Sequence, residues 1–402
     1  MKKGFKYIAV ASAFLSAPYV MAEVTISGTV DQSYERFITK TNPTNAALGP
    51  YSSSVNGSEN VNRIASTLAN YNSLSFKGNE DVGSGLKATF EISIKNTGPD
   101  NADVVVANYL SHVGLEGGFG KLKIGSQWRP LFSAVAAIDP TQLASTPGFV
   151  GAGKNGTGLS GLAPDPNPNS LTYNFPNVVP GLFIQAQKGL GEAATAATAG
   201  QGDNHGLYLI FTDGQTFYAA YAMHSQKMTA RSFLAASATG TNGLGTAVIL
   251  PAAVAGADLT LPQLTVAGLN GLDHRLYTAT GGETRDSQGF AGSYNFGPAK
   301  LVLGTVTEDV AGTQAKLSMN AWGVKVPASE NVDLGFLSTK ANHTRSTGTQ
   351  FSLSGYKMLA TYGLSKRTKA YFARGTQKLD GGTTAGNEFS STITSVGLNH
   401  GF

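Results

Sequence analysis

The chain has 402 residues, of which 13% are charged, 50 are glycine and none is cysteine. Soluble domains usually carry about 25% charged residues, so this chain has too little charge for an ordinary cytosolic surface, and without cysteine it has no disulfide, thiolate nucleophile or cysteine-ligated metal site. The formal net charge of +4 raises the question of a nucleic-acid or anionic partner, and the answer depends on where the charges lie.

The first 22 residues have the pattern of a secretory signal peptide. Three lysines in the first six residues precede an apolar stretch from Tyr7 to Leu15, and residues 20–22 form a cleavage site. The apolar stretch is too short for a spanning helix, which needs ~20 residues. We therefore expect residues 1–22 to be removed and the mature chain to begin at Glu23. Without those three lysines, 26 basic residues face 25 acidic ones, so the charge does not favour a nucleic-acid partner.

Strand-like alternation begins directly after this segment and recurs to the end of the chain. In Leu86–Lys95, apolar side chains alternate with polar ones without interruption, which is the period of a β-strand with one apolar and one polar face. The same alternation occurs in residues 24–35, 121–127 and 396–402, and about sixteen such segments can be counted. Helical spacing is not sustained anywhere in the mature chain, so the sequence predicts an all-β fold.

The connections between these segments alternate in length. Long connections cover residues 36–71, 128–168 and 227–287, whereas the turns between them are short, such as 79–85, 116–120 and 364–367. Outer-membrane barrels have short periplasmic turns and long external loops, and a sheet can cross a bilayer only when it is closed. We therefore expect a transmembrane antiparallel β-barrel of about sixteen strands, with apolar faces toward lipid and polar faces toward a water-filled interior. A large secreted antiparallel β protein is the alternative.

Four blocks of sequence resemble one known family. They are the strand–turn–strand blocks Leu74–Glu91 (LSFKGNEDVGSGLKATFE) and His112–Gln127 (HVGLEGGFGKLKIGSQ), the middle block Asn169–Gly189, and the C-terminal block Ser395–Phe402 (SVGLNHGF). Together they resemble the general diffusion porins of Gram-negative bacteria, in the neisserial and Burkholderia-like branch. The resemblance is weakest between residues 190 and 290.

The resemblance implies a porin in the outer membrane of a Gram-negative bacterium, a water-filled channel for passive diffusion of ions and small hydrophilic solutes. It implies a barrel formed by residues 23–402, a homotrimer, and a constriction loop at 128–168 that folds into the lumen. It also implies outer-membrane lipid and lipopolysaccharide as partners, and a barrel-insertion machinery that reads the C-terminal strand through Phe402. An aromatic residue at this position fits the aromatic girdle at a lipid–water interface.

The candidate pore-lining residues carry both signs of charge. Those on the expected constriction loop are Arg129, Asp139 and Asp165, and the alternation places Lys77, Lys87, Glu91, Lys121 and Lys123 on the polar faces of their strands. In the family, acidic loop residues face a ladder of wall arginines, and the field between them sorts solutes by charge. At three of those arginine positions this chain has Ser73, Tyr109 and Ser126, so we predict weak ion selectivity.

Other functions are less consistent with the sequence. Residues 151–156 match G-x-G-x-x-G, but no strand precedes them and no helix follows, as a phosphate-binding loop requires. Ser111 and His112 are adjacent on a strand and point to opposite faces, so they do not form a nucleophile–base pair, and the histidines lack metal-ligand spacing. We therefore expect no enzyme, cofactor or metal. A substrate-specific channel or a surface-recognition barrel remains the alternative, because the long loops are large enough to bind a ligand.

Overall fold

The computed structural model describes residues 23–41, 58–68, 72–96, 106–142, 144, 166–191, 202–227, 239–241, 247–249, 284–312, 314, 316–344, 350–380 and 388–402. The described elements are β1 (Glu23–Thr41), β2 (Ser58–Ala65), β3 (Asn72–Gly83), β4 (Leu86–Asn96), β5 (Val106–Gly117), β6 (Gly120–Gln127), α3 (Pro130–Ala136), β7 (Asn167–Asn174), β8 (Leu182–Gly189), β9 (Asn204–Thr212), β10 (Phe217–Lys227), β11 (Thr239–Thr241), β12 (Ala247–Ile249), β13 (Thr284–Asn295), β14 (Lys300–Val310), β15 (Lys316–Ser329), β16 (Val332–Thr344), β17 (Gln350–Gly363), β18 (Thr368–Asp380) and β19 (Glu388–Gly401). Within these ranges no helix is long and apolar enough to cross a bilayer. The predicted signal peptide and the glycine motif at 151–156 lie outside the described residues.

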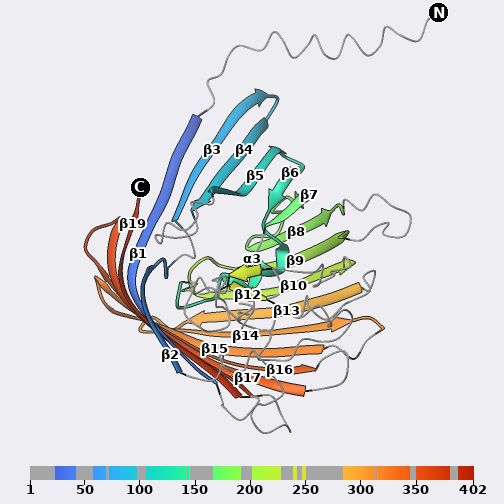
Figure 1. The fold of residues 1–402 in the computed structure, drawn as a ribbon. Helices are drawn as coiled ribbons and strands as arrows, with labels where there is room; N and C mark the ends of the chain where they lie inside the picture. The colour runs from blue at the N-terminus through green and yellow to red at the C-terminus, as the bar shows by residue number, and fades with distance from the viewer. Residues whose placement is uncertain are drawn as a thin grey trace, which may run out of the picture.

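Seventeen of the described strands form one closed antiparallel sheet, whereas β11 and β12 form a separate pair. The barrel closes where β1 pairs with β19, and in Figure 1 the blue β1 lies beside the red β19. β3 pairs with residues 23–29 of β1 and β2 pairs with residues 33–40, so β2 and β3 share one position in the wall. The seventeen strands therefore fill sixteen positions, which confirms the predicted sixteen-stranded barrel.

The last residue of the chain closes the barrel against the first strand. The Phe402 amide donates to the Gly28 carbonyl at 3.0 Å, and the Gly28 amide donates to the Phe402 carbonyl at 3.1 Å. A Cβ atom at position 28 would overlap the Phe402 ring. Glycine at position 28 thus lets the terminal ring lie directly over the backbone of β1.

The short turns have the backbone geometry that their glycines predict. In the β3–β4 turn, Gly83 and Gly85 have φ angles of 88° and 75°, and Ser84 between them also has a positive φ of 54°. The Gly83 amide donates to Asp81 Oδ1 at 2.8 Å, as is common for aspartate in turns. The turn therefore joins β3 and β4 as a tight hairpin.

The expected long connection at 36–71 was assigned too many residues. β1 continues to Thr41, and the chain re-enters the sheet at Ser58 as β2. The sequence predicts an earlier end of the strand because, from Arg36 on, the charged residue lies on the expected lipid-facing side and the apolar residue on the expected interior side. Phe37 points inward and is 3% exposed, whereas Arg36 lies on the outer face.

Between β2 and β3 the chain leaves the wall and is held by Asp31 of β1. The carboxylate Oδ2 of Asp31 accepts hydrogen bonds from the amides of Thr67 at 2.6 Å and Leu68 at 2.8 Å. The Ser66 hydroxyl donates to the Asp31 carbonyl at 2.9 Å. These bonds satisfy amides that have left the sheet. They bring the fully buried Leu68 into the same apolar cluster as Ala144, a residue of the 128–168 segment.

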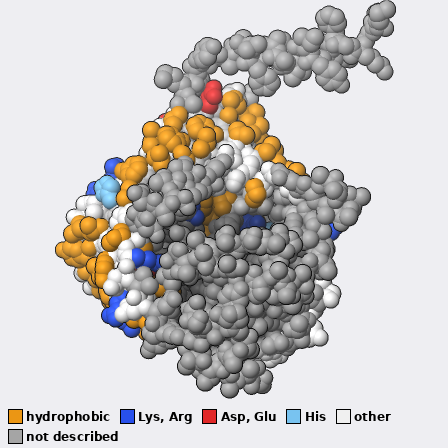
Figure 2. All heavy atoms as spheres, viewed as in Figure 1, with side chains coloured by type: hydrophobic (Ala, Val, Ile, Leu, Met, Phe, Trp, Pro, Cys, Tyr) orange, Lys and Arg blue, Asp and Glu red, His pale blue; other side chains and the backbone are white. Residues whose placement is uncertain are grey.

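The outer surface of the barrel is rich in large apolar side chains. On β1, Val24 is 52% exposed and Ile26 is 58% exposed. Figure 2 shows hydrophobic side chains over much of the described outer surface in that view. An exposed apolar face on a closed sheet is the arrangement that a lipid bilayer stabilises.

Candidate functional site

The segment that follows β6 turns into the barrel and forms α3 (Figure 1). Arg129 has extended backbone angles (φ −71°, ψ 143°), the conformation that a following proline favours. Pro130 is the first helical residue, where a missing N–H breaks no intrahelical bond. The helix contacts β8, β9, β10 and β13. The described part of the 128–168 segment therefore lies inside the barrel, against one side of the wall.

An apolar cluster fixes this segment to the wall. Its members from the segment are Leu131, Ala134, Val135 and Ile138. Its members from the wall are buried residues of β10 and β13–β16: Ala220, Ala222, Ala291, Val302, Val306, Leu317, Met319, Ala321, Leu337 and Ala341. Burying one aliphatic side chain contributes roughly 1.5–3 kcal/mol. Packing of this extent holds α3 against the wall.

The wall under α3 is apolar, which differs from the polar interior that the sequence predicts for every strand. On β15, Met319 is 3% exposed and packs on the α3 side, whereas Trp322 is 52% exposed on the outer face. A Cβ atom at Gly289 of β13 would lie 2.9 Å from the Leu131 side chain, so the glycine lets α3 lie close to the backbone of β13. Because the helix needs a dry partner surface, apolar side chains point inward here.

Beyond α3, a buried ion pair fastens the segment to β17. Lys357 Nζ lies 3.3 Å from Asp139 Oδ2, and both side chains are completely buried. Lys357 also donates to the Ala144 carbonyl at 3.3 Å. The other oxygen of Asp139 accepts hydrogen bonds from the Thr141 amide at 2.8 Å and the Thr141 hydroxyl at 2.6 Å. Each charge is thus paired and hydrogen-bonded, as burial requires.

Two glycines of the wall make room for Pro140, the residue after Asp139. A Cβ atom at Gly335 of β16 would overlap the Pro140 carbonyl oxygen, and one at Gly323 of β15 would lie 3.0 Å from its ring. Further along, the Lys369 ammonium group on β18 donates to the Gln142 side chain. Residues 130–142 and 144 are therefore seated along the inner wall from β9 to β18.

The inner wall of β3–β6 carries charged side chains arranged in pairs. Lys77 Nζ lies 3.2 Å from Glu91 Oε1, and His112 Nε2 lies 3.5 Å from Glu91 Oε2. These three residues are in register on β3, β4 and β5. On β5 and β6, Lys121 Nζ lies 3.1 Å from Glu116 Oε2. Most of the charge on this wall is therefore locally compensated.

The wall between these pairs and α3 is polar but uncharged. The Asn167 amide group donates to Gln187 Oε1 at 2.8 Å and to Asn204 Oδ1 at 2.7 Å. Gln187 in turn donates to the Thr172 hydroxyl and to the Trp128 carbonyl, both at 3.0 Å. The network joins β7, β8 and β9 and holds the root of the inward segment at Trp128.

The structure places the predicted strand residues together on one wall. Lys87 is in register with both Asp81 and Glu116, and Lys123 is in register with Gly114 and Thr172. The positions where family arginines are expected lie nearby. The Ser126 hydroxyl donates to the Tyr109 carbonyl at 3.4 Å, and the Tyr109 ring makes an edge contact with Trp128 at 4.8 Å.

The three predicted residues of the inward segment have different environments. Arg129 directly precedes α3 and interacts electrostatically with His224 of β10. Asp139 is buried against Lys357, so its carboxylate does not contact pore water. Asp165 lies outside the described residues.

Sequence reasoning missed several inward-facing charged residues. Lys357 sits in an alternating strand at a position that faces the interior, and its parity was the available signal. On β13 and β14, Arg285 Nε lies 3.7 Å from Glu308 Oε2, and the Ser287 hydroxyl donates to the same oxygen at 2.7 Å. Arg285 and Glu308 meet only because of the register between β13 and β14, and the alternation within one strand does not specify that register.

The described residues contain no group of three His, Asp or Glu side chains able to hold a metal ion. Ser111 and His112 are consecutive residues of β5, paired with Ser126 and Gly125 of β6, and consecutive residues of a strand point to opposite faces. The imidazole of His112 faces Glu91 rather than a serine hydroxyl.

A closed antiparallel barrel whose lumen is narrowed by an inward chain segment is the architecture of a channel-forming outer-membrane barrel. The chain belongs to the Gram-negative porin family, whose family model matches residues 8–382. It is thus a protein of the bacterial outer membrane. It is similar to the major outer membrane protein P.IB of Neisseria meningitidis serogroup B, with 33% identity over 127 residues, which cover 31% of this chain and 33% of that protein. The matched region thus spans about a third of that relative's length.

Two solved structures have the same fold. The anion-selective porin from Comamonas acidovorans has a TM-score of 0.63 at 20% identity, and the match covers 95% of this chain and 100% of that one. OmpT of Vibrio cholerae in its trimer form has a TM-score of 0.58 at 13% identity, with 95% and 99% covered. These similarities support the barrel and its strand order.

Proposed function

We propose that the protein forms a water-filled channel for passive diffusion of ions and small hydrophilic solutes across the outer membrane. The observation that carries this proposal is the one-sided seating of residues 130–142 and 144. They lie against the inner face of β9–β18 and leave the polar wall of β3–β8 to line the passage. A path lined by paired charges and amide groups suits hydrated solutes of either sign.

The proposed ion selectivity is weak, with a slight preference for anions. On β3–β6 the register brings the inward lysines opposite Glu91 and Glu116, so that much of the positive charge is compensated. The proposed pore-lining set is Arg129, Asp165, Lys77, Lys87, Glu91, Lys121 and Lys123, with Asp139 acting from its buried position on the shape of the loop. In planar bilayers with a KCl gradient, we expect a stable conductance and a small reversal potential. The absence of any conductance would contradict the proposed channel. A strong preference for anions or for cations would contradict the proposed weak selectivity.

Liposome swelling with neutral sugars separates a general pore from a substrate-specific channel. A smooth fall in rate with solute size supports general diffusion, whereas one saturable sugar supports a specific site. We assign the protein no catalytic role, and an esterase assay of the purified protein tests this assignment.

We further propose that the protein is a homotrimer, as one solved structure of the same fold, OmpT, is in its trimer form. The outer face of β1–β6 carries a row of aliphatic residues that are between 46% and 58% exposed: Val24, Ile26, Val30, Ile92, Val113 and Ile124. We expect Ile124→Lys to give monomers in light scattering. Leu301→Lys on β14, which is 47% exposed on another part of the wall, is the matched control. Equal trimer content in both variants would contradict this interface.

The proposed route to the membrane uses both ends of the chain. Residues 1–22 act as a cleaved signal peptide, and Phe402 is read by the barrel-insertion machinery. Deleting Phe402 is expected to lower the amount of folded protein in outer-membrane fractions at least several-fold, while refolding in detergent changes less. Equal outer-membrane levels would contradict the assembly role. The remaining partners are outer-membrane lipid and lipopolysaccharide.

A further inference from the structure

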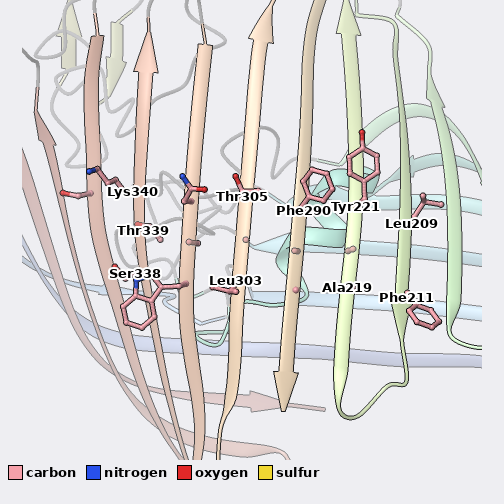
Figure 3. Close-up of a pocket in the computed structure, with 18 of the residues that line it drawn as sticks. Leu209, Phe211, Ala219, Tyr221, Phe290, Leu303, Thr305, Ser338, Thr339 and Lys340 are labelled. Carbon is pink, nitrogen blue, oxygen red and sulfur yellow. The ribbon is translucent and has the colours of Figure 1, made fainter. Parts of the chain in front are cut away.

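A cluster of polar side chains lies on the inner faces of β10, β13 and β14, beside the apolar wall under α3. Figure 3 shows the opposite, outer face of this wall, where Tyr221 of β10 and Phe290 of β13 stand side by side, with ring centroids 4.8 Å apart. Side chains alternate between the two faces of a strand. His224 of β10 and Arg285 of β13 therefore point inward, and both are almost completely buried, at 3% and 1% exposed.

The inner wall changes from apolar to polar at this cluster. On β10, Ala222 belongs to the apolar cluster that holds α3, and His224 is the next inward residue. His224 is in register with Ser287 of β13, and Ser287 is in register with Glu308 of β14. The polar side chains thus form one row across three strands at the edge of the apolar wall.

The root of the inward segment lies close to this row. Gly206 of β9 is in register with His224, and a Cβ atom at Gly206 would lie 3.2 Å from the Pro130 ring. Arg129, which precedes this proline, interacts electrostatically with His224, as does Arg285. The cluster therefore lies between the wall and the start of α3.

The described protein groups do not satisfy all of the polar atoms in the cluster. Among the described residues, the two ring nitrogens of His224 and the Nε and Nη1 groups of Arg285 have no hydrogen-bond partner. Arg285 Nη2 donates to Gln226 Oε1 at 3.1 Å. Arg285 Nε lies 3.7 Å from Glu308 Oε2, too far for a hydrogen bond, and this oxygen accepts the Ser287 hydroxyl instead. Since buried polar groups are nearly always paired, these atoms need a further partner.

The charges around His224 favour an anion as this partner over a water molecule. The N–H groups of arginine only donate hydrogen bonds. Two guanidinium groups, of Arg129 and Arg285, interact with His224, whereas one carboxylate, of Glu308, pairs with Arg285. A buried positive charge is costly unless it is compensated. A water molecule would accept hydrogen bonds here without compensating the charge, whereas an anion does both.

We propose that Arg285 and His224 bind a small inorganic anion of the size of chloride, which joins the root of the inward segment to the wall of β10 and β13. The Nε and Nη1 groups of Arg285 and the N–H group of His224 donate to the ion, and Arg129 adds positive charge from the start of α3. Because the ion lies between the segment and the wall, it is a resident ion and not one of those that pass through the channel.

Bromide, which replaces chloride and scatters anomalously, tests the position of the site. Crystals grown in sodium bromide should give an anomalous difference peak between Arg285 and His224. His224→Phe keeps a ring and removes the donor, so the peak should be lost. His400→Phe, at an exposed position on β19, is the matched control and should keep it. The proposal is overturned by a wild-type structure with no peak there, or by equal peaks in the two variants.

Thermal melts in detergent give a second measurement that does not need crystals of a variant. With ionic strength held constant by sodium isethionate, chloride should raise the wild-type melting midpoint and the effect should saturate, because a ligand that binds only the folded state stabilises it. Arg285→Lys keeps the positive charge opposite Glu308 but loses the paired donors. Losing one hydrogen bond to an ion should raise the half-saturating chloride concentration about tenfold. An equal chloride response in wild type and Arg285→Lys would contradict the site.

Other occupants give different results. An ordered water molecule at this place in bromide crystals would overturn the choice of an anion. Stabilisation by sulfate without stabilisation by chloride or bromide would overturn the choice of a small ion. Neither measurement depends on conduction, so a wild-type protein without channel activity would contradict the proposed function and leave the anion site testable.

Discussion

Lys357 of β17 and Asp139 of the inward segment form a fully buried ion pair, with 3.3 Å between Nζ and Oδ2, although 218 positions separate them in the chain. Asp139 directly follows Ile138, the last residue of the segment in the apolar cluster. The pair therefore extends the attachment of the segment beyond the cluster, from the wall of β10 and β13–β16 to β17. The width of the passage therefore depends on contacts that lie outside the passage itself.

Breaking this pair should loosen the inward segment. Removing one partner of a buried ion pair typically costs about 3–5 kcal/mol because the other charge is left uncompensated. We expect Lys357→Met and Asp139→Asn each to increase open-channel current noise and change single-channel conductance. The combination of the two substitutions removes both charges and should return part of the wild-type behaviour. Lys366→Met, in an exposed turn, is the control, and single variants as quiet as the control would contradict the anchoring role.

Gly335 should be intolerant of any side chain, because a Cβ atom there overlaps the Pro140 carbonyl oxygen. Overpacking of this kind costs about 1–3 kcal/mol. We expect Gly335→Ala to lower the thermal stability of the barrel and to alter conductance by displacing residues 139–142. Gly363→Ala is the matched control, since its Cβ atom would find no neighbour closer than 3.8 Å. If the two variants melt and conduct alike, the seating of Pro140 is unimportant.

Glu91 should moderate the preference for anions, because it lies between Lys77 and His112 on the inner wall. A unit charge at ~10 Å in a water-filled passage contributes roughly 0.4 kcal/mol. The shift has opposite signs for anions and cations, so we expect Glu91→Gln to raise the anion-to-cation permeability ratio by up to about fourfold, as measured by reversal potentials in a KCl gradient. Glu80→Gln removes the same charge from an exposed position near the β3–β4 turn and should have little effect. A shift toward cations in Glu91→Gln would contradict this assignment.

The ionised carboxylate of Asp213 should stabilise the β9–β10 turn, and this stabilisation should be lost at strongly acidic pH. Hydrogen bonds from the backbone amides of Phe217 (3.0 Å), Gln215 (3.0 Å) and Thr216 (2.8 Å) lower the pKa of Asp213 from 3.8 to about 2. Because the folded pKa lies below the unfolded one, the stabilisation is complete above the unfolded pKa and is lost as the pH falls through about 2. In thermal melts, Asp213→Asn should lie below wild type at pH 6, and the gap should narrow as the pH falls toward 2. Glu330→Gln is the control turn variant, and a gap that stays constant with pH would contradict the role of the carboxylate.

The sequence alone determined the barrel. Alternation with a period of two in segments such as Leu86–Lys95, together with turns of alternating length, predicts strands that cross a bilayer. Such a sheet must close, because only closure satisfies every backbone group in a bilayer. The charged residues of β3–β6 could also be assigned to one face, since local alternation decides which side chains share a face. The position of Arg129 at the root of the inward segment makes it a candidate pore residue, and its role stays a prediction.

Only the tertiary structure decided where the inner face of the wall is apolar. On β15 the apolar face points inward, because residues 130–138 supply it with a dry partner. Asp139, which the sequence suggested as a pore-lining charge, is instead buried against Lys357, a residue that alternation alone did not distinguish from other strand lysines. Alternation is a local property of one strand, whereas the environment of a face depends on what packs against it from distant parts of the chain.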